Sequence, residues 1–345
     1  MTDSSLVNDL DAILDRCADD LRSLTGARVF ITGGTGFVGT WLLAALHHAD
    51  QRLQLGLSPI LLTRSPAAFA QRQPALARWV TSVAGDIVAV PPIGTVDAAI
   101  HAATPASAAF NDAHPDLMRE TIVAGMSSVL EALSPSGAIP LLFTSSGAIY
   151  GAQPLDLERL PESFTPAAGT IEARNAYAHG KREAEAMAQA ASEAGGPSLR
   201  LARLFAFVGP YLPLDAHFAI GNFIRDALAG GPIRVAGDGT AVRSYLYAGD
   251  MVEQLLAILV RGEPNRPYNV GSEQAISIAD LARAVAASVS PDCRVEIAGA
   301  QHSALPTGAG SRYVPDTTRV RTELATEPNT SLFEAIDRTA THHRS

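Results

Sequence analysis

The chain has 345 residues, of which 47% are hydrophobic and 18% charged, and its formal net charge is −9. This length and apolar content can bury the core of one or two folded domains, which argues against an intrinsically disordered protein. The acidic balance argues against a nucleic-acid partner, and two cysteines outside any paired motif argue against a disulfide framework and a metal site.

The N-terminal segment has no basic stretch followed by an apolar core, and no apolar run approaches the roughly 20 residues that cross a bilayer. We therefore expect a cytoplasmic protein without a membrane partner. Within residues 6–24, apolar side chains recur at three- and four-residue spacings with aspartates between them. This periodicity predicts an amphipathic helix within residues 1–25, which would dock on the same domain or on a neighbouring subunit.

Short apolar runs alternate with helical patterns from residue 27 onward. Residues 28–32 predict the first strand, and residues 36–49 predict the helix after it. Further strands are predicted at residues 59–63, 82–84, 98–101, 139–145, 198–204 and 267–270, and further helices at residues 67–79 and 116–133. This alternation indicates an α/β fold of the Rossmann type, with a doubly wound parallel sheet.

The chain is predicted to divide into two interwoven regions. Residues 26–203 form a dinucleotide-binding domain, and residues 244–275 return to it. Residues 206–243 contain several prolines and a Gly-Asp-Gly turn, as expected of an insertion that covers a substrate. Residues 204–243 and 276–345 are therefore predicted to form a smaller C-terminal lobe that binds the substrate.

A glycine-rich turn, TGGTGFVG at residues 32–39, lies between the first strand and the first helix of the domain. Glycines at this spacing allow a tight turn, a close approach to a pyrophosphate, and close packing of helix on strand. Free amides at the positive N-terminal end of the helix then bind the phosphates. The turn predicts cofactor contacts at Gly33, Thr35, Gly36, Phe37, Val38 and Gly39.

Residues after the next strands are predicted to complete the dinucleotide site. Arg64 and Ser65 stand where an acidic residue would bind the adenosine hydroxyls. They suit a 2′-phosphate better, which favours NADP without excluding NAD. His101 is expected to be a packed histidine rather than a catalyst. Further cofactor contacts are predicted at Asp86, Ile87, Ala102, Ala103 and Thr104.

Tyr177 and Lys181 are four residues apart and so share one face of a predicted helix. A free tyrosine has a pKa near ~10, and we expect a nearby ammonium and the positive nicotinamide of an oxidised cofactor to lower it. Tyr177 could then take a hydroxyl proton as hydride leaves, or return it on reduction. Ser146, in the segment TSSGAIYG at residues 144–151, is the candidate that hydrogen-bonds the reacting oxygen, with Ser145 as the alternative.

With these motifs the sequence resembles the extended short-chain dehydrogenases/reductases of the NAD(P)-dependent nucleotide-sugar epimerase/dehydratase family, from about residue 26 to 338. The other segments that carry the resemblance are RLFAFVGP at 203–210, GDGTAVRSY at 237–245 and YNVGS at 268–272. The resemblance implies a nucleoside-diphosphate sugar as substrate and a homodimer, with Tyr177 and Lys181 also contacting the cofactor. It further implies that Arg243 grips the diphosphate, that Asn222 lines the site and that Arg312 adds a phosphate contact.

Two small residues decide between the reactions of this family. Gly147 and Ala148 stand where dehydratases usually carry an Asp-Glu pair, and decarboxylases usually have a glutamate at the second position. Elimination of water needs an acid and a base beyond the hydride-transfer pair. The residues therefore favour a 4-epimerase, with an NADPH-dependent 4-keto-sugar reductase as the alternative and a 4,6-dehydratase or decarboxylase ranked lower.

Other departures from the family pattern leave further alternatives open. Asparagines are expected where Ile122 and Ala206 stand, and the second change puts a usual phosphoryl contact in doubt. Glu162 or Glu172 could supply a displaced carboxylate, although a surface position is expected for both. A dinucleotide sensor without activity and a reductase of small aromatic or acyl carbonyls are alternatives from other classes, and residues 237–245 argue against the latter.

Overall fold

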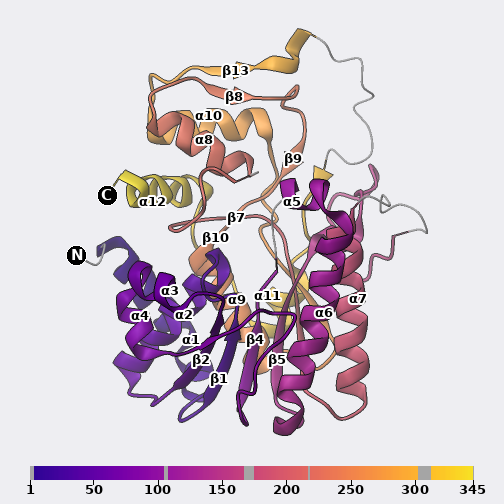
Figure 1. The fold of residues 1–345 in the computed structure, drawn as a ribbon. Coiled ribbons are helices and arrows are strands. Elements are labelled where there is room, and N and C mark those ends of the chain that lie inside the picture. The colour runs from indigo at the N-terminus through magenta and orange to yellow at the C-terminus, as the bar shows by residue number, and fades with distance from the viewer. Residues whose placement is uncertain (1–3, 105–107, 167–174, 217, 302–311, 345) are drawn as a thin grey trace.

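The computed structural model describes residues 4–104, 108–166, 175–216, 218–301 and 312–344. Its centre is a seven-stranded sheet of parallel pairs in the order β11-β6-β5-β4-β1-β2-β3 (Figure 1). The strands are β1 (Arg28–Thr32), β2 (Ser58–Thr63), β3 (Thr81–Ala84), β4 (Ala98–His101), β5 (Pro140–Ser146), β6 (Ser198–Leu204) and β11 (Pro267–Val270). This is the strand order of a Rossmann fold, so the predicted fold class is confirmed.

Helices cover both faces of the sheet because its strands, apart from the edge strand β3, bury side chains on both faces. In β1, Val29 and Ile31 pack into one core, whereas Phe30 between them packs into another. The first core includes residues of α1 (Ser4–Arg22), α2 (Phe37–Leu53) and α9 (Ala248–Arg261). The second includes residues of α6 (Pro115–Leu133), which packs against α7 (Ala176–Glu193).

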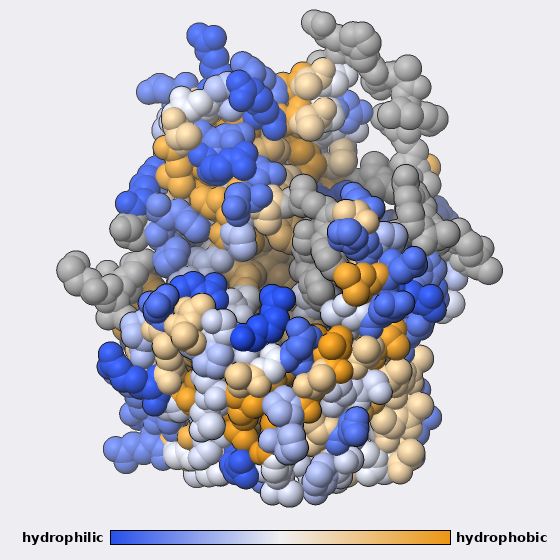
Figure 2. All heavy atoms as spheres, in the orientation of Figure 1, coloured by the Kyte–Doolittle hydropathy of each residue, from blue (hydrophilic) through white to orange (hydrophobic). Residues whose placement is uncertain are grey.

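A second group of elements lies above the sheet in Figure 1, and Figure 2 shows the surface set back between the two groups. In it, β8 pairs with β13 in parallel, α8 packs on α10, and α12 packs on both of these helices. The bounds are α8 (Ala219–Leu228), β8 (Ile233–Val235), α10 (Ile278–Val289), β13 (Val295–Ile297) and α12 (Leu332–Arg344).

Short strands and helices connect the two groups. β9 lies between an antiparallel partner, β12, and a parallel partner, β14, and β10 pairs in parallel with β7. The bounds are β7 (Phe207–Val208), β9 (Val242–Arg243), β10 (Leu246–Tyr247), β12 (Ile276–Ser277), β14 (Arg312–Tyr313), α5 (Ala108–Ala113) and α11 (Thr318–Leu324). Three 3₁₀ turns complete the elements: η1 (Ser134–Ser136), η2 (Gly147–Tyr150) and η3 (Ala298–Gln301).

The predicted helix at residues 67–79 is in fact two helices, α3 (Pro66–Arg72) and α4 (Pro74–Trp79). Pro74 has no amide hydrogen, and it disfavours a helical conformation at Gln73 before it, whose φ and ψ are −133° and 64°. The stretch at 206–243 also contains more regular structure than its prolines indicate, because α8 and three short strands lie within it.

Helix α1 docks on its own chain, against α9 and α2. Two of its aspartates are buried and paired, although the sequence places aspartates on its outer faces. Asp9 accepts hydrogen bonds from Tyr247 and from Arg338 of α12, and Asp20 pairs with Arg261 at 2.7 Å. Helix α1 therefore links α12 to α2 and α9, which cover the central sheet.

None of the helices within the described residues is both long and apolar enough to cross a bilayer.

Candidate active site

The glycine turn lies against the loop that follows β4. Gly33 has a φ of +74°, and a Cβ there would lie 2.4 Å from the carbonyl carbon of Ala102. A Cβ on Gly39 would lie 2.2 Å from the carbonyl oxygen of Gly33. Both glycines are therefore required by backbone packing, as the motif predicts, and the turn meets Ala102 and Ala103 at the carboxyl ends of neighbouring strands.

Gly36 differs from these two glycines because its side-chain position is nearly open. A Cβ there would meet only the Gly33 carbonyl oxygen, at 3.5 Å, and Gly36 is the exposed N-cap of α2 with φ −88°. The first-turn amides of a helix have no intrahelical acceptor, so those of Phe37 and Val38 are available to an anion. This open cradle at a helix N-terminus fits a dinucleotide pyrophosphate, and Thr35 lies within the same turn.

Gly36→Ala is expected to weaken dinucleotide binding at least tenfold, because its Cβ would fill the cradle where phosphate approaches. The free energy of unfolding should change by less than about 1 kcal/mol, since the backbone conformation suits any L-residue. Calorimetric titration and urea unfolding measure the two quantities. Gly39→Ala is the contrasting control, expected to destabilise the fold itself, and wild-type affinity in Gly36→Ala would contradict the prediction.

The loop after β4 is held by a buried hydroxyl. Thr32 Oγ1 lies 2.8 Å from His101 Nδ1 and accepts the Ala103 amide at 3.3 Å. His101 stacks on Phe143, and burial, with the Lys181 charge as a smaller cause, lowers its pKa to about 3. A neutral imidazole in this packing is a structural residue, in line with the sequence-based interpretation.

The residues predicted to bind the adenosine lie at the ends of β2 and β3, which are adjacent strands. Arg64 is exposed, and among the described residues it forms no ion pair. Ser65 accepts the Ala68 amide at 3.3 Å as the cap of α3. Asp86 is exposed and accepts the Val88 amide at 3.2 Å. Ile87 packs on α6, where a Cβ at Gly125 would lie 3.0 Å from it.

Tyr177 lies in the first turn of α7, and two asparagines hold that turn in place. Asn175 caps the helix by accepting the Ala178 amide at 3.1 Å. Asn111 on α5 accepts the Tyr177 amide at 3.0 Å. These bonds fix the N-terminus of α7 and tie it to α5. Helix α7 also packs on β5, whose end carries Ser146.

The two serines at the end of β5 point to opposite faces, as alternation along a strand requires. Ser146 Oγ accepts the Ala148 amide at 3.1 Å, and its hydroxyl lies near enough to Tyr177 to lower the pKa of that phenol. Ser145 instead donates to Glu185, which is bound by Arg203 through two hydrogen bonds. The geometry therefore brings Ser146, rather than Ser145, to Tyr177.

Lys181 is buried, with 1% of its surface exposed, one turn after Tyr177. Its Nζ donates to Thr104 Oγ1 and to the carbonyl oxygen of Thr144, each at 2.7 Å, and lies 5.9 Å from the centroid of the Tyr177 ring. Burial lowers the pKa of the ammonium to about 7, although Glu185 acts in the opposite direction. Thr104 and Lys181, both predicted to contact the cofactor, are thus in direct contact.

The surroundings of Tyr177 within the chain raise its pKa, and the expected lowering also involves the positive charge of an oxidised cofactor. Burial of the phenol is the largest cause, and the Ser146 hydrogen bond opposes it. The Lys181 ammonium directs its hydrogen bonds to Thr104 and Thr144, not to the phenol. Lowering the pKa of Tyr177 therefore requires a further positive charge beside it.

The structure brings two of the three predicted substrate residues together. Arg243 and Arg312 lie on the paired strands β9 and β14, where Arg312 is in register with Val242. Arg243 donates to the Val242 carbonyl at 2.8 Å, and Arg312 to the Glu158 carbonyl at 2.7 Å. Asn222 is placed separately on α8, where its amide faces backbone carbonyls at residues 214 and 216.

Of the two acidic residues considered as displaced catalysts, Glu162 lies within the described residues and is held by other groups. Glu162 is buried, which contradicts the expected surface position, and burial raises its pKa. Its carboxylate accepts the Asn269 amide at 2.9 Å and faces Arg319. Glu172 lies outside the described residues. Ile122, where an asparagine was expected, fills the contact between α6 and Gly180 of α7.

Two aromatic residues beside the serine were missed by the sequence-based reasoning. Phe205, at the end of β6, stacks on Tyr313 of β14 with ring centroids 4.5 Å apart. Both lie next to Gly147. Tyr313 is more than 130 residues from Tyr177 in the chain and has no motif of its own, so only the folded structure shows the contact.

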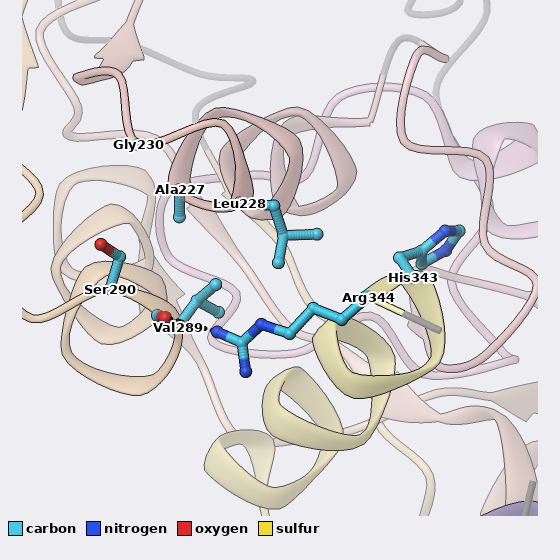
Figure 3. A pocket seen from close by; sticks show the side chains of 7 residues that line it. All are labelled: Ala227, Leu228, Gly230, Val289, Ser290, His343 and Arg344. Carbon is cyan, nitrogen blue, oxygen red and sulfur yellow. Dashed lines mark hydrogen bonds between the residues drawn. The ribbon is translucent and has the colours of Figure 1, made fainter.

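A cavity of about 380 Å³ lies elsewhere, between the ends of α8, α10 and α12 (Figure 3). Its lining residues are Ala227, Leu228, Gly230, Val289, Ser290, His343 and Arg344. It contains none of the predicted site residues and is distinct from the candidate active site. Within the described ranges, no group of three or more His, Cys, Asp and Glu side chains could hold a metal ion.

Comparisons with known proteins agree with this geometry. Residues 29–271 match the model of the NAD dependent epimerase/dehydratase family. UDP-glucuronic acid decarboxylase 6 from Arabidopsis thaliana is 30% identical over 313 residues, which cover 90% of this chain and 86% of that protein.

Two solved structures share the fold. UDP-glucose 4-epimerase from Thermotoga maritima, solved with UDP-glucose, has a TM-score of 0.75 at 21% identity and covers 92% of this chain and 98% of that one. The dTDP-glucose 4,6-dehydratase DesIV from Streptomyces venezuelae, solved with NAD, has a TM-score of 0.74 at 22% identity. The matched region covers 92% of this chain and 97% of that one.

Proposed function

Because the chain belongs to the NAD dependent epimerase/dehydratase family and is therefore an enzyme, we propose that it epimerises a nucleoside-diphosphate sugar at C4. A bound nicotinamide dinucleotide would supply the oxidation of C4 and the later reduction from the other face of the sugar. The glycine turn at residues 33–39 would hold that dinucleotide by its backbone amides. Arg243 and Arg312, on adjacent strands, would bind the substrate diphosphate.

Three side chains would carry out the proton chemistry. Tyr177 removes the proton of the C4 hydroxyl and later returns it, acting as base and then as acid. Ser146, whose hydroxyl lies near Tyr177, would hold the same sugar oxygen. Lys181 would supply positive charge one helical turn away, which stabilises the phenolate.

The observation that carries the choice of epimerisation is the absence of a carboxylate at the two positions after Ser146. Gly147 and Ala148 have no acidic group, and the nearby Glu162 and Glu185 are each bound to partners. Oxidation, rotation of the sugar and reduction need only the hydride-transfer residues. Dehydration needs an additional acid and base.

A decarboxylase is the second candidate, because the Arabidopsis relative carries that name and is similar over 90% of the chain. A 4-keto-sugar reductase is the third candidate. It is supported by Arg64, which favours the NADPH that such an enzyme would consume. Each makes a different product: an isomer of equal mass, a sugar that has lost CO₂, or a reduced sugar.

A panel of UDP- and dTDP-sugars, incubated with the purified protein and analysed by mass spectrometry and NMR, tests the proposal. We expect a product of unchanged mass with inverted C4 stereochemistry and no net consumption of dinucleotide. Loss of CO₂ or water, or stoichiometric oxidation of NADPH, would each contradict epimerisation and identify the corresponding alternative.

Cofactor preference is a separate proposal, in which Arg64 selects NADP. Arg64→Ala should weaken NADP⁺ binding by about tenfold or more, because it removes a charge-assisted contact to the 2′-phosphate. NAD⁺ binding should stay within about twofold. Arg72→Ala, at the exposed end of α3, is the control with the same loss of charge. Equal effects of Arg64→Ala on both dinucleotides would disprove the preference.

A further inference from the structure

Lys181 is the only lysine among the 345 residues, and the other strongly basic side chains of the chain are arginines. It is buried beside the predicted catalytic residues, with 1% of its surface exposed. A charge can be buried in a protein where polar groups replace the water that it loses. The groups that surround the Lys181 ammonium therefore decide where this charge stands relative to Tyr177.

Three groups of the chain contact the ammonium. Thr104 Oγ1 and the carbonyl oxygen of Thr144 each accept a hydrogen bond from Nζ at 2.7 Å, and the centroid of the Phe143 ring lies 4.7 Å from Nζ. The carbonyl oxygen is present whichever residue stands at position 144, and the Phe143 ring also packs in a core with residues of α6 and α7. Thr104 thus makes the one contact of the three that depends on a polar side chain.

The loop after β4 holds the Thr104 hydroxyl in the orientation that this contact needs. The hydroxyl donates its proton to the Ala103 carbonyl at 2.8 Å, which leaves its lone pairs for the lysine. The Ala103 amide donates to Thr32 Oγ1 at 3.3 Å, and the same amide nitrogen lies 2.5 Å from where a Cβ on Gly33 would stand. The loop that carries Thr104 is therefore packed against β1 and the glycine turn, whereas Lys181 comes from α7.

The carboxylate one turn later on the same helix is occupied by other groups. Glu185 stands four residues after Lys181, at the spacing at which lysine and glutamate commonly pair on a helix. Arg203 donates to both oxygens of this carboxylate, at 3.2 and 2.8 Å, and Ser145 donates to one of them. Because these donors satisfy Glu185, the ammonium is free to direct its hydrogen bonds to Thr104 and Thr144.

We propose that Thr104 is a positioning residue of the active site, whose hydroxyl oxygen fixes the Lys181 ammonium between the loop after β4 and the end of β5, one helical turn from Tyr177. This inference rests on the proposed role of Lys181 in stabilising the Tyr177 phenolate. A lysine carries its charge on a flexible four-carbon stem, so an acceptor is needed to hold that charge in one place. The two hydrogen bonds use two of the three N–H groups and leave the third for a bound dinucleotide.

The single lysine allows a direct test, because protein labelled with ¹³C at the lysine ε-carbon contains one such carbon. Its NMR chemical shift follows protonation of the amine, and we expect cofactor-free wild type to titrate at about pH 7. Thr104→Val keeps the shape of the side chain but removes the acceptor. Its midpoint should fall by about 0.5 to 1 pH unit, because a hydrogen bond to the charged form favours that form. Thr104→Ser keeps the acceptor and should titrate within about 0.3 pH unit of wild type.

Thr144→Val is the matched control, because it also deletes a buried threonine hydroxyl, whereas Lys181 contacts Thr144 through the carbonyl oxygen. Its midpoint should stay within about 0.3 pH unit of wild type. In turnover near pH 7, Thr104→Val should lower kcat about three- to tenfold, in proportion to the protonated lysine that is lost, with KM for the sugar nucleotide within about twofold. Thr104→Ser should restore kcat to within about twofold of wild type.

An unmoved midpoint in Thr104→Val would overturn the inference. An equal fall in Thr144→Val would also overturn it, because the effect would then come from any loss of polarity near the lysine. Weaker dinucleotide binding in Thr104→Val with an unmoved midpoint would assign the hydroxyl to the cofactor instead. Thermal melting verifies that the variants fold. If no sugar nucleotide turns over, the proposed function fails, while the titration still decides the role of Thr104.

Discussion

Replacing Tyr177 with phenylalanine is expected to lower kcat about 10²- to 10⁴-fold while dinucleotide affinity stays within about threefold. The variant removes one oxygen atom, the only group in the proposed mechanism that exchanges a proton with the C4 hydroxyl. The Asn175 cap and the Asn111 contact involve main-chain amides, so α7 should begin where it does now. The rate of product formation and equilibrium titration of the dinucleotide measure the two effects.

Tyr268→Phe serves as the control, because it also deletes one phenol oxygen of a buried tyrosine, in β11 and away from the site, where the oxygen accepts the Glu263 amide. Its kcat should stay within about twofold of wild type. If Tyr177→Phe retained more than a tenth of the wild-type kcat, Tyr177 would not be the acid and base. The inactive-sensor alternative would be supported only if wild type itself transformed no sugar nucleotide.

Lys181→Met is expected to lower activity and raise stability together. Activity should fall about 10²-fold or more, because the charge that favours the phenolate is lost. Without bound dinucleotide, the variant should be more stable at pH 7 by roughly 1 to 3 kcal/mol, because a buried ammonium no longer has to be accommodated. The lost hydrogen bonds to Thr104 and Thr144 offset part of that gain.

The pKa of Lys181 determines how the stability difference between Lys181→Met and wild type changes with pH. Burial lowers the pKa of Lys181 to about 7 in the folded protein, against 10.5 for an unperturbed lysine. Between these values the unfolded chain binds more protons, so the contribution of Lys181 makes wild-type stability rise with pH. The advantage of Lys181→Met should therefore shrink from pH 7 towards pH 10. Urea unfolding of both proteins across this window measures it, and a variant less stable than wild type at pH 7 would refute the prediction.

The sheet and its cofactor turn were predictable because their signals are local. Most of the seven strands are short apolar runs, and Gly33, Gly36 and Gly39 stand at the spacing of a tight turn between a strand and a helix. Tyr177 and Lys181 were recognisable for the same reason, since four residues on a helix define one face. The spacing of residues close in the chain was therefore enough to predict the sheet, the glycine turn and the shared helix face of Tyr177 and Lys181.

The remaining features depend on contacts between distant segments. Nothing around Tyr313 indicates that its hydroxyl lies beside Gly147, and nothing around Glu162 indicates that it accepts the Asn269 amide. The direction of the Tyr177 pKa also depends on packing, because burial of the phenol raises it and the Lys181 ammonium donates to Thr104 rather than to the phenol. Burial and hydrogen-bond direction follow from tertiary packing.

The pairing of Asp9 with Arg338 connects residues 329 positions apart, at the two ends of the chain. During synthesis, α1 leaves the ribosome before α12, which carries this partner. The other buried aspartate of α1, Asp20, pairs with Arg261 of α9, which also follows much later in the chain. The apolar face of α1 can pack on α2 early, but its two buried carboxylates reach their partners only after these later helices have been made. The first helix to form is thus among the last to have its buried charges paired.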